Sequence, residues 1–261
     1  MRVPLEEVGR RGRLELTFAP QDGRTVLRDS YCEVPFKITR VLNPDSSVVD
    51  LILMQCTAGL FGGDDVECSI RVARGARVRI TQQSATKVHP SQDRPAVQRN
   101  HVIVEEGAEL RLYMEALIPF ANSHLRQSTV LEVRPGGSLL FWEGFMTGRV
   151  GKGESWEFRE LQSETRLRVA ESLAYLDRFR VRPDASSESP WSMRLNTYVG
   201  TGIYVGNEAR CVAAELHESL PSAGVEALSD SVAIARVVAN NGPDFQRARE
   251  VFCRVVETPS E

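Results

Sequence analysis

The chain has 261 residues, of which 42% are hydrophobic and 26% are charged. This composition supplies enough apolar side chains for a buried core and excludes a largely disordered chain. The formal net charge of −3 creates no strong electrostatic field, so composition indicates neither nucleic acid nor an anionic membrane as a partner. The five cysteines have long, irregular spacings without a Cys-x-x-Cys pair, which argues against a disulfide framework or a structural zinc site.

The N-terminal stretch, residues 1–16, lacks the apolar segment of a signal peptide. The apolar runs are also much shorter than the roughly 20 residues that a membrane-spanning helix requires. We therefore expect a cytoplasmic protein without a membrane anchor.

Short strands are predicted along the first three quarters of the chain, because apolar and polar residues partly alternate there between Gly, Pro and polar pairs. The predicted strands comprise residues 14–18, 48–55, 66–72, 78–82, 101–104, 109–114 and 129–133. Helical periodicity is scarce before about residue 205. The pattern predicts a mainly β protein.

Three similar segments follow one another in this region: residues 75–80 (GARVRI), 107–112 (GAELRL) and 136–141 (GGSLLF). In each, a strand-like run and two polar residues precede a glycine, and a second strand follows. Glycine is suited to the positive φ angle of a tight corner. A repeat of about thirty residues favours stacked rungs of a solenoid, while an ordinary β-sandwich with similar turns explains the pattern equally well.

The C-terminal quarter combines strands and helices. Residues 196–205 and 231–239 have strand composition, and residues 207–220 and 243–256 place apolar side chains on one helical face. Core packing explains both faces, and a groove of a partner protein is the alternative. We expect one domain over residues 1–261, solenoid-like at about 10–205 and mixed α/β at about 206–257.

Three stretches are candidates for chemistry: residues 57–65 (TAGLFGGDD), 81–89 (TQQSATKVH) and 148–154 (GRVGKGE). Asp64 offers oxygen ligands for a cation or caps a turn. Glu154 pairs with Arg149 or Lys152, or faces a cation. The glycine-rich stretch is neither a Walker A loop nor a dinucleotide fingerprint, since the spacing differs. The four histidines lack the spacing of a helical metal site.

In this order, these stretches resemble the signature regions of the UreD/UreH family of urease accessory proteins. Residues 57–64 match its Gly-Gly-Asp stretch, and residues 83–87 (QSATK) match a Thr-Gln-x-Ala-Thr-Lys-like stretch. Residues 107–110 (GAEL), 118–120 (IPF) and 148–154 match the later motifs, and residues 12–16 (GRLEL) match the opening. The chain departs from the family pattern at His89, where Tyr or Phe is usual.

The resemblance implies a right-handed β-helix or solenoid of layered sheets with two C-terminal helices. It also implies a scaffold without catalytic turnover that binds UreF, the GTPase UreG and apo-urease, and forms a dimer of heterocomplexes. No cofactor would be permanently bound, and nickel would pass through or along the chain transiently. The alternative is a β-solenoid carbohydrate-active enzyme or binding module.

Within this reading, Asp64 and Glu154 are the candidate residues of a transient nickel route, lined by Ser84 and Thr86. Nickel(II) accepts nitrogen and oxygen ligands, and a route for it requires weak, exchangeable binding. The two C-terminal helices are the candidate partner surface. The candidate anchors on these helices are Phe252, Phe245 and Leu216.

Overall fold

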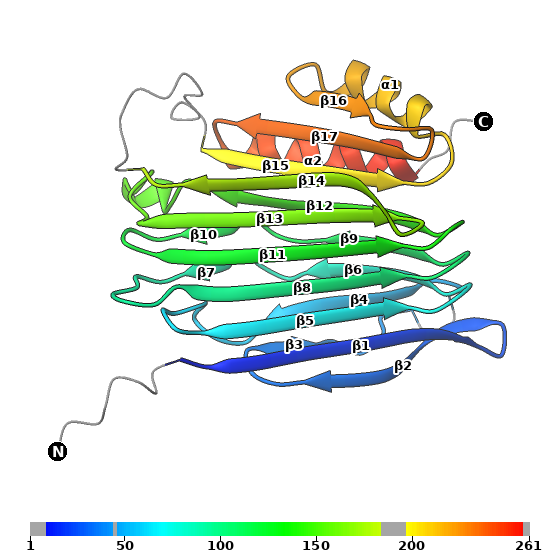
Figure 1. The fold of residues 1–261 in the computed structure, drawn as a ribbon, viewed down its shortest axis with the longest axis horizontal. Coiled ribbons are helices and arrows are strands. Elements are labelled where there is room, and N and C mark those ends of the chain that lie inside the picture. Colours follow the sequence, from blue (N-terminus) through cyan, green and yellow to red (C-terminus); the bar gives the residue numbers. More distant parts are fainter. Residues whose placement is uncertain (1–8, 44–45, 184–196, 258–261) are drawn as a thin grey trace.

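The computed structural model describes residues 9–43, 46–183 and 197–257, and most of their strands stack into two facing sheets (Figure 1). The seven-stranded sheet contains, from edge to edge, β14 (Ser172–Val181), β13 (Glu160–Val169), β11 (His124–Val133), β8 (Ala96–Val104), β5 (Asp65–Val72), β1 (Arg11–Gln21) and β2 (Arg24–Cys32). Its neighbours from β1 through β13 are parallel, whereas β2 and β14 pair antiparallel at the two edges.

The second sheet lies behind the first in Figure 1. It contains, in order, β16 (Gly224–Ala227), β17 (Val232–Ala239), β15 (Tyr198–Val205), β12 (Ser138–Met146), β9 (Glu109–Tyr113), β6 (Arg77–Gln82), β4 (Val49–Gln55) and β3 (Phe36–Ile38). Two short strands are attached to it, β10 (Leu117–Pro119) beside β12 and β7 (Thr86–Val88) beside β10. The chain alternates between the sheets as it rises, which makes a β-solenoid of about four turns.

Tight corners join the two sheets at one end of the solenoid. Gly75, Gly107 and Gly136 each have a φ angle near +70°, which glycine adopts without steric cost. They follow β5, β8 and β11 and precede β6, β9 and β12. The predicted glycine corners and the stacked-rung interpretation are therefore confirmed, and the alternative of an ordinary sandwich is not.

The main core fills the space between the sheets. Register places one apolar side chain of each rung above the next, so that a column of buried residues forms in each sheet. In the seven-stranded sheet this column comprises Leu16, Ile70, Val102, Leu131 and Leu167. Because every rung covers its neighbours, the stack buries far more apolar surface than a single rung can.

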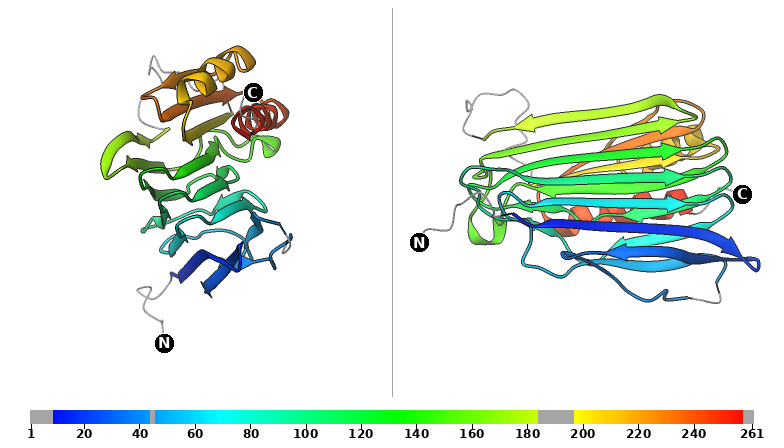
Figure 2. Two further views of the ribbon diagram at one scale, coloured as in Figure 1. Left: turned by 90° about the vertical axis from the view of Figure 1, so that its right-hand side faces the viewer. Right: turned by 60° about the horizontal axis from the view of Figure 1, so that its bottom comes forward.

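Two helices cover the outer face of the ten-stranded sheet (Figures 1 and 2). The first, α1 (Ala209–Ser219), and the second, α2 (Gly242–Glu257), agree with the predicted helices. A 3₁₀ turn (Val150–Lys152) lies between β12 and β13. Among the described residues, no helix is long and apolar enough to span a bilayer.

Glycines in the sheet make room for aromatic rings of α2. A Cβ atom at Gly200 would lie 2.7 Å from the ring of Phe245, and one at Gly202 would lie 2.5 Å from the ring of Phe252. Trp142 of β12 contacts both rings, with centroids 5.6 and 5.5 Å away. The strands therefore present a shallow surface, shaped for α2, on which these side chains form a second hydrophobic cluster.

Candidate functional site

Side chains from the signature loops stack on one another at the end of the solenoid opposite the glycine corners. The rings of Phe61 and His89 are parallel within 5° at 4.2 Å, and His89 contacts Phe120 edge-on at 4.9 Å. The guanidinium carbon of Arg149 lies 4.2 Å from the Phe120 ring centroid, within the range of a cation–π contact. We call these four residues the loop-end ladder; it joins four of the signature stretches that are far apart in sequence.

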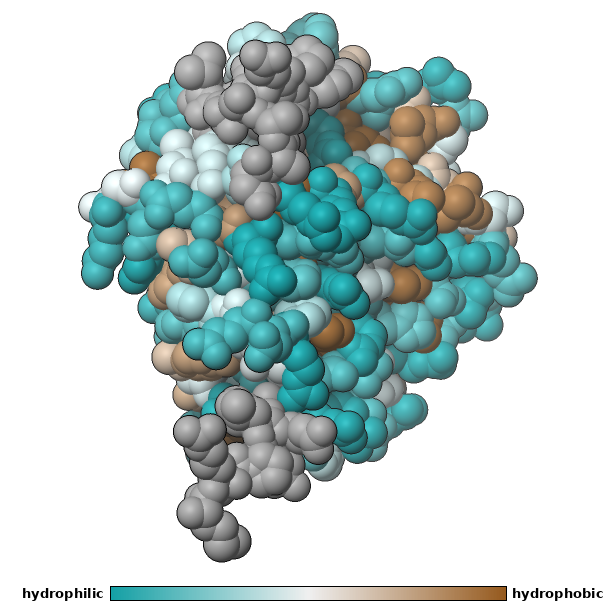
Figure 3. All heavy atoms as spheres, turned by 60° about the vertical axis from the view of Figure 1, so that its left-hand side comes forward, coloured by the Kyte–Doolittle hydropathy of each residue, from teal (hydrophilic) through white to brown (hydrophobic). Residues whose placement is uncertain are grey.

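Backbone pairing supports the loop-end ladder. Leu60 forms a parallel bridge with Val88, and β7 pairs in parallel with β10. The short segments that carry Phe61, His89 and Phe120 are thereby held side by side. Figure 3 shows this end of the molecule as mainly hydrophilic with scattered hydrophobic residues, and Phe61 is 43% exposed.

The His89 side chain contacts Phe61 and Phe120 through its ring, and its Nε2 lies 2.9 Å from the backbone oxygen of Ala58. Replacing His89 with phenylalanine is expected to lower the free energy of unfolding by about 1 kcal/mol, because the ring contacts with Phe61 and Phe120 are retained but the hydrogen bond to Ala58 is lost. Alanine at the same position is expected to cost about 2 kcal/mol, because the ring contacts are lost as well. Urea denaturation of the two variants measures this, and equal losses would show that the ring contacts do not stabilise the loops.

The structure gives Asp64 a structural role. Its side chain is 5% exposed, and its carboxylate accepts hydrogen bonds from the backbone N–H groups of Arg10 (2.7 Å) and Phe61 (2.9 Å). These bonds hold the glycine-rich loop against the start of β1. Both carboxylate oxygens therefore accept a hydrogen bond from the protein. This agrees with the alternative prediction that Asp64 caps a turn.

Glu154 is also engaged by protein groups. Arg149 donates two hydrogen bonds to its carboxylate, one of them from Nε at 2.8 Å, and these bonds lower the pKa of Glu154. The backbone N–H of Ala121 adds a longer contact of 3.4 Å. The contacts of Asp64 and Glu154 link them to different loops and not to each other. Among residues 9–43, 46–183 and 197–257, no group of three or more His, Cys, Asp or Glu side chains is placed to hold a metal ion.

The two residues predicted to line the route, Ser84 and Thr86, lie in different environments. Ser84 is exposed, whereas Thr86 is 2% exposed and accepts a hydrogen bond from Gln82 Nε2 at 2.8 Å. Thr86 borders a cavity between the sheets. Of the four residues predicted for the nickel route, Thr86 is the one that leads to the polar interior.

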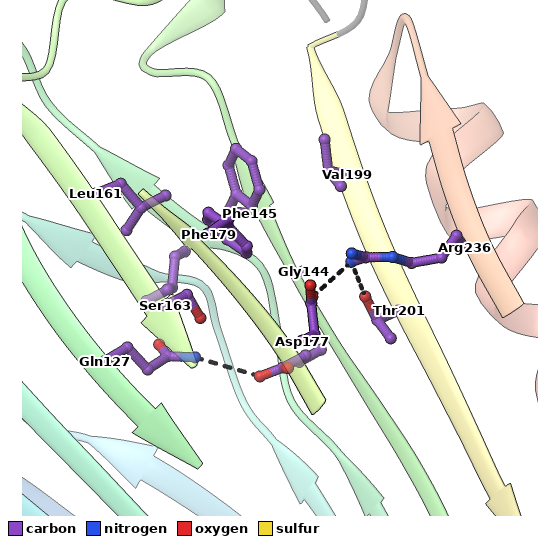
Figure 4. Close-up of a pocket in the computed structure, with 12 residues that line it drawn as sticks. Gln127, Gly144, Phe145, Leu161, Ser163, Asp177, Phe179, Val199, Thr201 and Arg236 are labelled. Carbon is purple, nitrogen blue, oxygen red and sulfur yellow. Dashed lines mark hydrogen bonds and ion pairs between the residues drawn. The ribbon is translucent and has the colours of Figure 1, made fainter. Parts of the chain in front are cut away.

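Polar side chains form a row between the sheets, crossing the core from rung to rung. Two cavities of about 20 Å³ lie along it, each with room for about one water molecule. The polar residues of the first cavity are Gln82, Thr86, Gln98, Asn100 and Glu115. Those of the second are Ser163, Asp177, Thr201 and Arg236 (Figure 4). Gln127 and Glu143 border both cavities. We call these eleven residues the interior polar row.

Glu143 is the central carboxylate of the row. It accepts hydrogen bonds from Thr165 Oγ1 at 2.5 Å and Gln127 Nε2 at 3.2 Å. Burial raises the pKa of Glu143 to about 7; the Thr165 hydrogen bond opposes the increase, and the Asp177 carboxylate adds to it. The side chain therefore changes charge near neutral pH, in a part of the protein that water reaches poorly.

Two side-chain carbonyl oxygens near Glu143 have no hydrogen-bond donor among the residues that the structure describes. They are Gln98 Oε1 and Asn100 Oδ1, and both atoms are buried. Buried polar atoms are usually satisfied, so these oxygens favour a small ligand such as water or a cation in the first cavity. Together with Glu143 they offer oxygen ligands of the kind that bind exchangeable divalent ions.

An ionic cluster stabilises the beginning of β13. Glu160 is 4% exposed as a side chain and accepts hydrogen bonds from Arg180, Arg182 and Gln162. Burial would raise the pKa of Glu160, but the hydrogen bonds from the two arginines and Gln162 outweigh it and lower the pKa to about 2. The cluster stabilises the pairing of β14 with β13 at the end of the solenoid that carries the loop-end ladder.

Replacing Glu160 with glutamine is expected to lower the free energy of unfolding at pH 7 by about 2 kcal/mol. The folded-state pKa lies below the ordinary value of 4.5, so this stabilisation is present above about pH 4.5 and is lost as the pH falls toward 2. The difference between the two proteins should therefore shrink in acid. Urea denaturation at pH 7, 4 and 3 measures it; Glu106, which is 60% exposed, is the control for the same substitution.

The three predicted partner anchors lie inside the fold. Phe252 and Leu216 are 0% exposed and Phe245 is 7% exposed. Their burial against the ten-stranded sheet agrees with the core-packing alternative. Direct contact with a partner through these side chains would require the helices to leave the sheet.

The family model described as "UreD urease accessory protein" matches residues 10–259. The chain is 32% identical over 249 residues to the urease accessory protein UreD of Deinococcus radiodurans, covering 94% of this chain and 90% of that protein. It is 31% identical over 250 residues to UreD of Cupriavidus necator, with 92% and 85% coverage. It is also 31% identical over 156 residues to UreH of Helicobacter pylori strain P12, with 60% and 59% coverage.

Proposed function

Because the chain belongs to the UreD family of urease accessory proteins, we propose that it is a non-catalytic scaffold that conducts nickel toward apo-urease along the interior polar row. Family membership supports a role in urease maturation. The further step, that nickel is the cargo and the interior is its path, is our proposal.

The Glu143 environment is the observation that carries this proposal. A permanent nickel site would require a set of strong ligands, whereas a route requires ligands that release the ion. Within the interior polar row, Asp177 and Glu115 form ion pairs with Arg236 and Arg249. The carboxylate of Glu143 instead accepts hydrogen bonds from the Thr165 hydroxyl and the Gln127 amide. With a pKa of about 7, Glu143 loses its proton readily when a cation approaches, and it regains one when the cation leaves.

This assignment replaces the route through Asp64 and Glu154. Those carboxylates are occupied by backbone donors and by Arg149, respectively, and moving them toward nickel would leave these donors unsatisfied. Thr86 remains part of the route because it borders the first cavity.

We propose UreF, the GTPase UreG and apo-urease as the partners, assembled as a dimer of heterocomplexes. GTP hydrolysis would belong to UreG, since this sequence has no phosphate-binding loop of the Walker type. Nickel would then be delivered by the GTPase and pass through this chain without a resident cofactor. The accessory role of the relatives supports this reading over a carbohydrate-active solenoid.

The test is urease activation in a urease-negative host grown with nickel. The cognate urease genes are expressed with and without this chain, and urea hydrolysis, urease protein level and the nickel content of purified urease are measured. We expect equal urease protein but active, nickel-containing enzyme only when the chain is present. Equal activity and nickel content in both cultures would refute the maturation role.

A further inference from the structure

Two arginine–carboxylate ion pairs with partly exposed side chains lie at the two ends of the interior polar row, and we call these ends its mouths. At one end Arg236 of β17 pairs with Asp177 of β14. At the other end Arg249 of α2 pairs with Glu115, which lies between β9 and β10. Asp177 and Glu115 are each among the residues that border a cavity of the row, and neither arginine belongs to a signature stretch.

The first pair bridges the two sheets. The Arg236 and Asp177 side chains meet at 2.9 Å, and Arg236 also donates to Thr201 Oγ1 at 2.8 Å (Figure 4). The Arg236 side chain is 41% exposed while that of Asp177 is 17% exposed, so the guanidinium reaches inward from the surface. Figure 2 shows β14 standing away from the strands of the ten-stranded sheet at this edge.

The second pair joins α2 to the loop before β10. The Arg249 side chain is 17% exposed and that of Glu115 is 28% exposed. The backbone N–H of Glu115 donates to Gln82 Oε1 at 3.1 Å, so this mouth is tied directly to the first cavity. Glu143 lies between the two mouths, since it borders both cavities.

A guanidinium at each mouth opposes the entry of cations in two ways. Its fixed positive charge repels an approaching cation, most strongly where water is scarce. Its hydrogen bonds also occupy the carboxylate that would otherwise be the first ligand at that mouth. An arginine that leaves its carboxylate needs another acceptor, so opening is coupled to a partner that offers one.

We propose that Arg236 and Arg249 are specificity-determining residues that close the two mouths of the interior polar row and keep free cations from Glu143. The identity of the cargo as nickel rests on the proposed function. Exclusion of cations is a property of this chain alone, so its test needs neither urease nor nickel.

The experiment places a reporter thiol beside each mouth. Ser163→Cys introduces one in the second cavity and Thr86→Cys one in the first; both native side chains are buried. Each reporter protein is treated with a cationic reagent, aminoethyl methanethiosulfonate, and with neutral iodoacetamide. Mass spectrometry of the peptide around each introduced thiol gives its rate separately from the five native cysteines.

Arg236→Met is expected to raise the rate of the cationic reagent at position 163 by about tenfold or more, and that of the neutral reagent by less. Arg249→Met is expected to do the same at position 86. Arg210→Met is the matched control, because Arg210 forms an ion pair with Asp230 on the surface of α1, away from both cavities. It should change neither rate.

Rates within twofold of the parent in both methionine variants would overturn the proposal. So would a rate increase that is equal for both reagents and at both positions, since that pattern reports general loosening of the fold. Loss of urease activation in cells bears on the proposed function and leaves the labelling result unaffected, so the two failures are distinguishable.

Discussion

Replacing Glu143 with glutamine is expected to remove most of the loss of stability that the parent protein shows between pH 5 and pH 8. The folded-state pKa of Glu143 is about 7 against an ordinary value of 4.5, so the folded state holds this proton more tightly than the unfolded state. The contribution of the protonated Glu143 to the free energy of unfolding therefore falls by roughly 2 to 3 kcal/mol as the pH rises from 5 to 8. Glutamine does not titrate, and urea denaturation at pH 5, 6, 7 and 8 measures the difference.

The same variant is expected to reduce urease activation. Glutamine keeps an oxygen that can accept from Thr165, but it removes the negative charge that a cation would meet in the row. We expect urea hydrolysis in the activation assay to fall about tenfold or more, with the variant present at the parent level. Full activation by a stable Glu143→Gln variant would refute a nickel route through the interior polar row.

Asp64→Asn provides the contrasting control for that assay. Its carboxylate accepts two backbone hydrogen bonds at the loop end, so asparagine is expected to lower stability with little effect on activation per folded molecule. A large loss of activation in a folded Asp64→Asn protein would favour the original assignment of the route.

Replacing Phe252 with alanine is expected to lower the free energy of unfolding by about 3 to 5 kcal/mol. The ring is fully buried against Trp142 and above Gly202, where the strand has no side chain to collapse into the space. Arg247→Ala on the exposed side of α2 is the control and is expected to stay within about 0.5 kcal/mol. Thermal and urea denaturation of the two variants measure this.

This variant also distinguishes the two interpretations of α2. If Phe252→Ala leaves stability unchanged but abolishes binding to UreF, the side chain is a partner anchor and its burial is not maintained in solution. If stability falls while the folded fraction still binds UreF, the helix stabilises the sheet and the partner contacts other residues.

The sequence predicts the repeating frame of the fold because that frame depends on local patterns. Gly75, Gly107 and Gly136 stand at the corners where they were expected, and each is followed by a strand. Helices α1 and α2 also form where apolar residues recur at helical spacing. Strands such as β13 and β14 were not predicted, because charged residues that form ion pairs on the sheet surface obscure their alternation.

Apart from Thr86, the residues of the interior polar row were not predicted, because each strand contributes only one or two of them. They include Gln127, Glu143, Asp177 and Arg236, which span more than a hundred positions. Strand register and the packing of the two sheets against each other bring these four side chains together. One feature of the sequence does predict the position of Glu143. It is separated by two residues from each of the buried Phe141 and Phe145, and side chains at this spacing lie on the same face of a strand. For the loop-end ladder, in contrast, the sequence motifs indicate which stretches matter. They do not predict that the side chains of these stretches stack on one another.

The shallow glycine surface under α2 has a consequence for biosynthesis. Strand β12, with Trp142 on its outer face, leaves the ribosome about 100 residues before α2 is complete. At usual elongation rates this face stays uncovered for roughly 5 to 20 s. A nascent chain with an exposed aromatic face tends to associate with other chains, so the yield of soluble protein should depend on elongation speed and on chaperones that hold this face until α2 arrives.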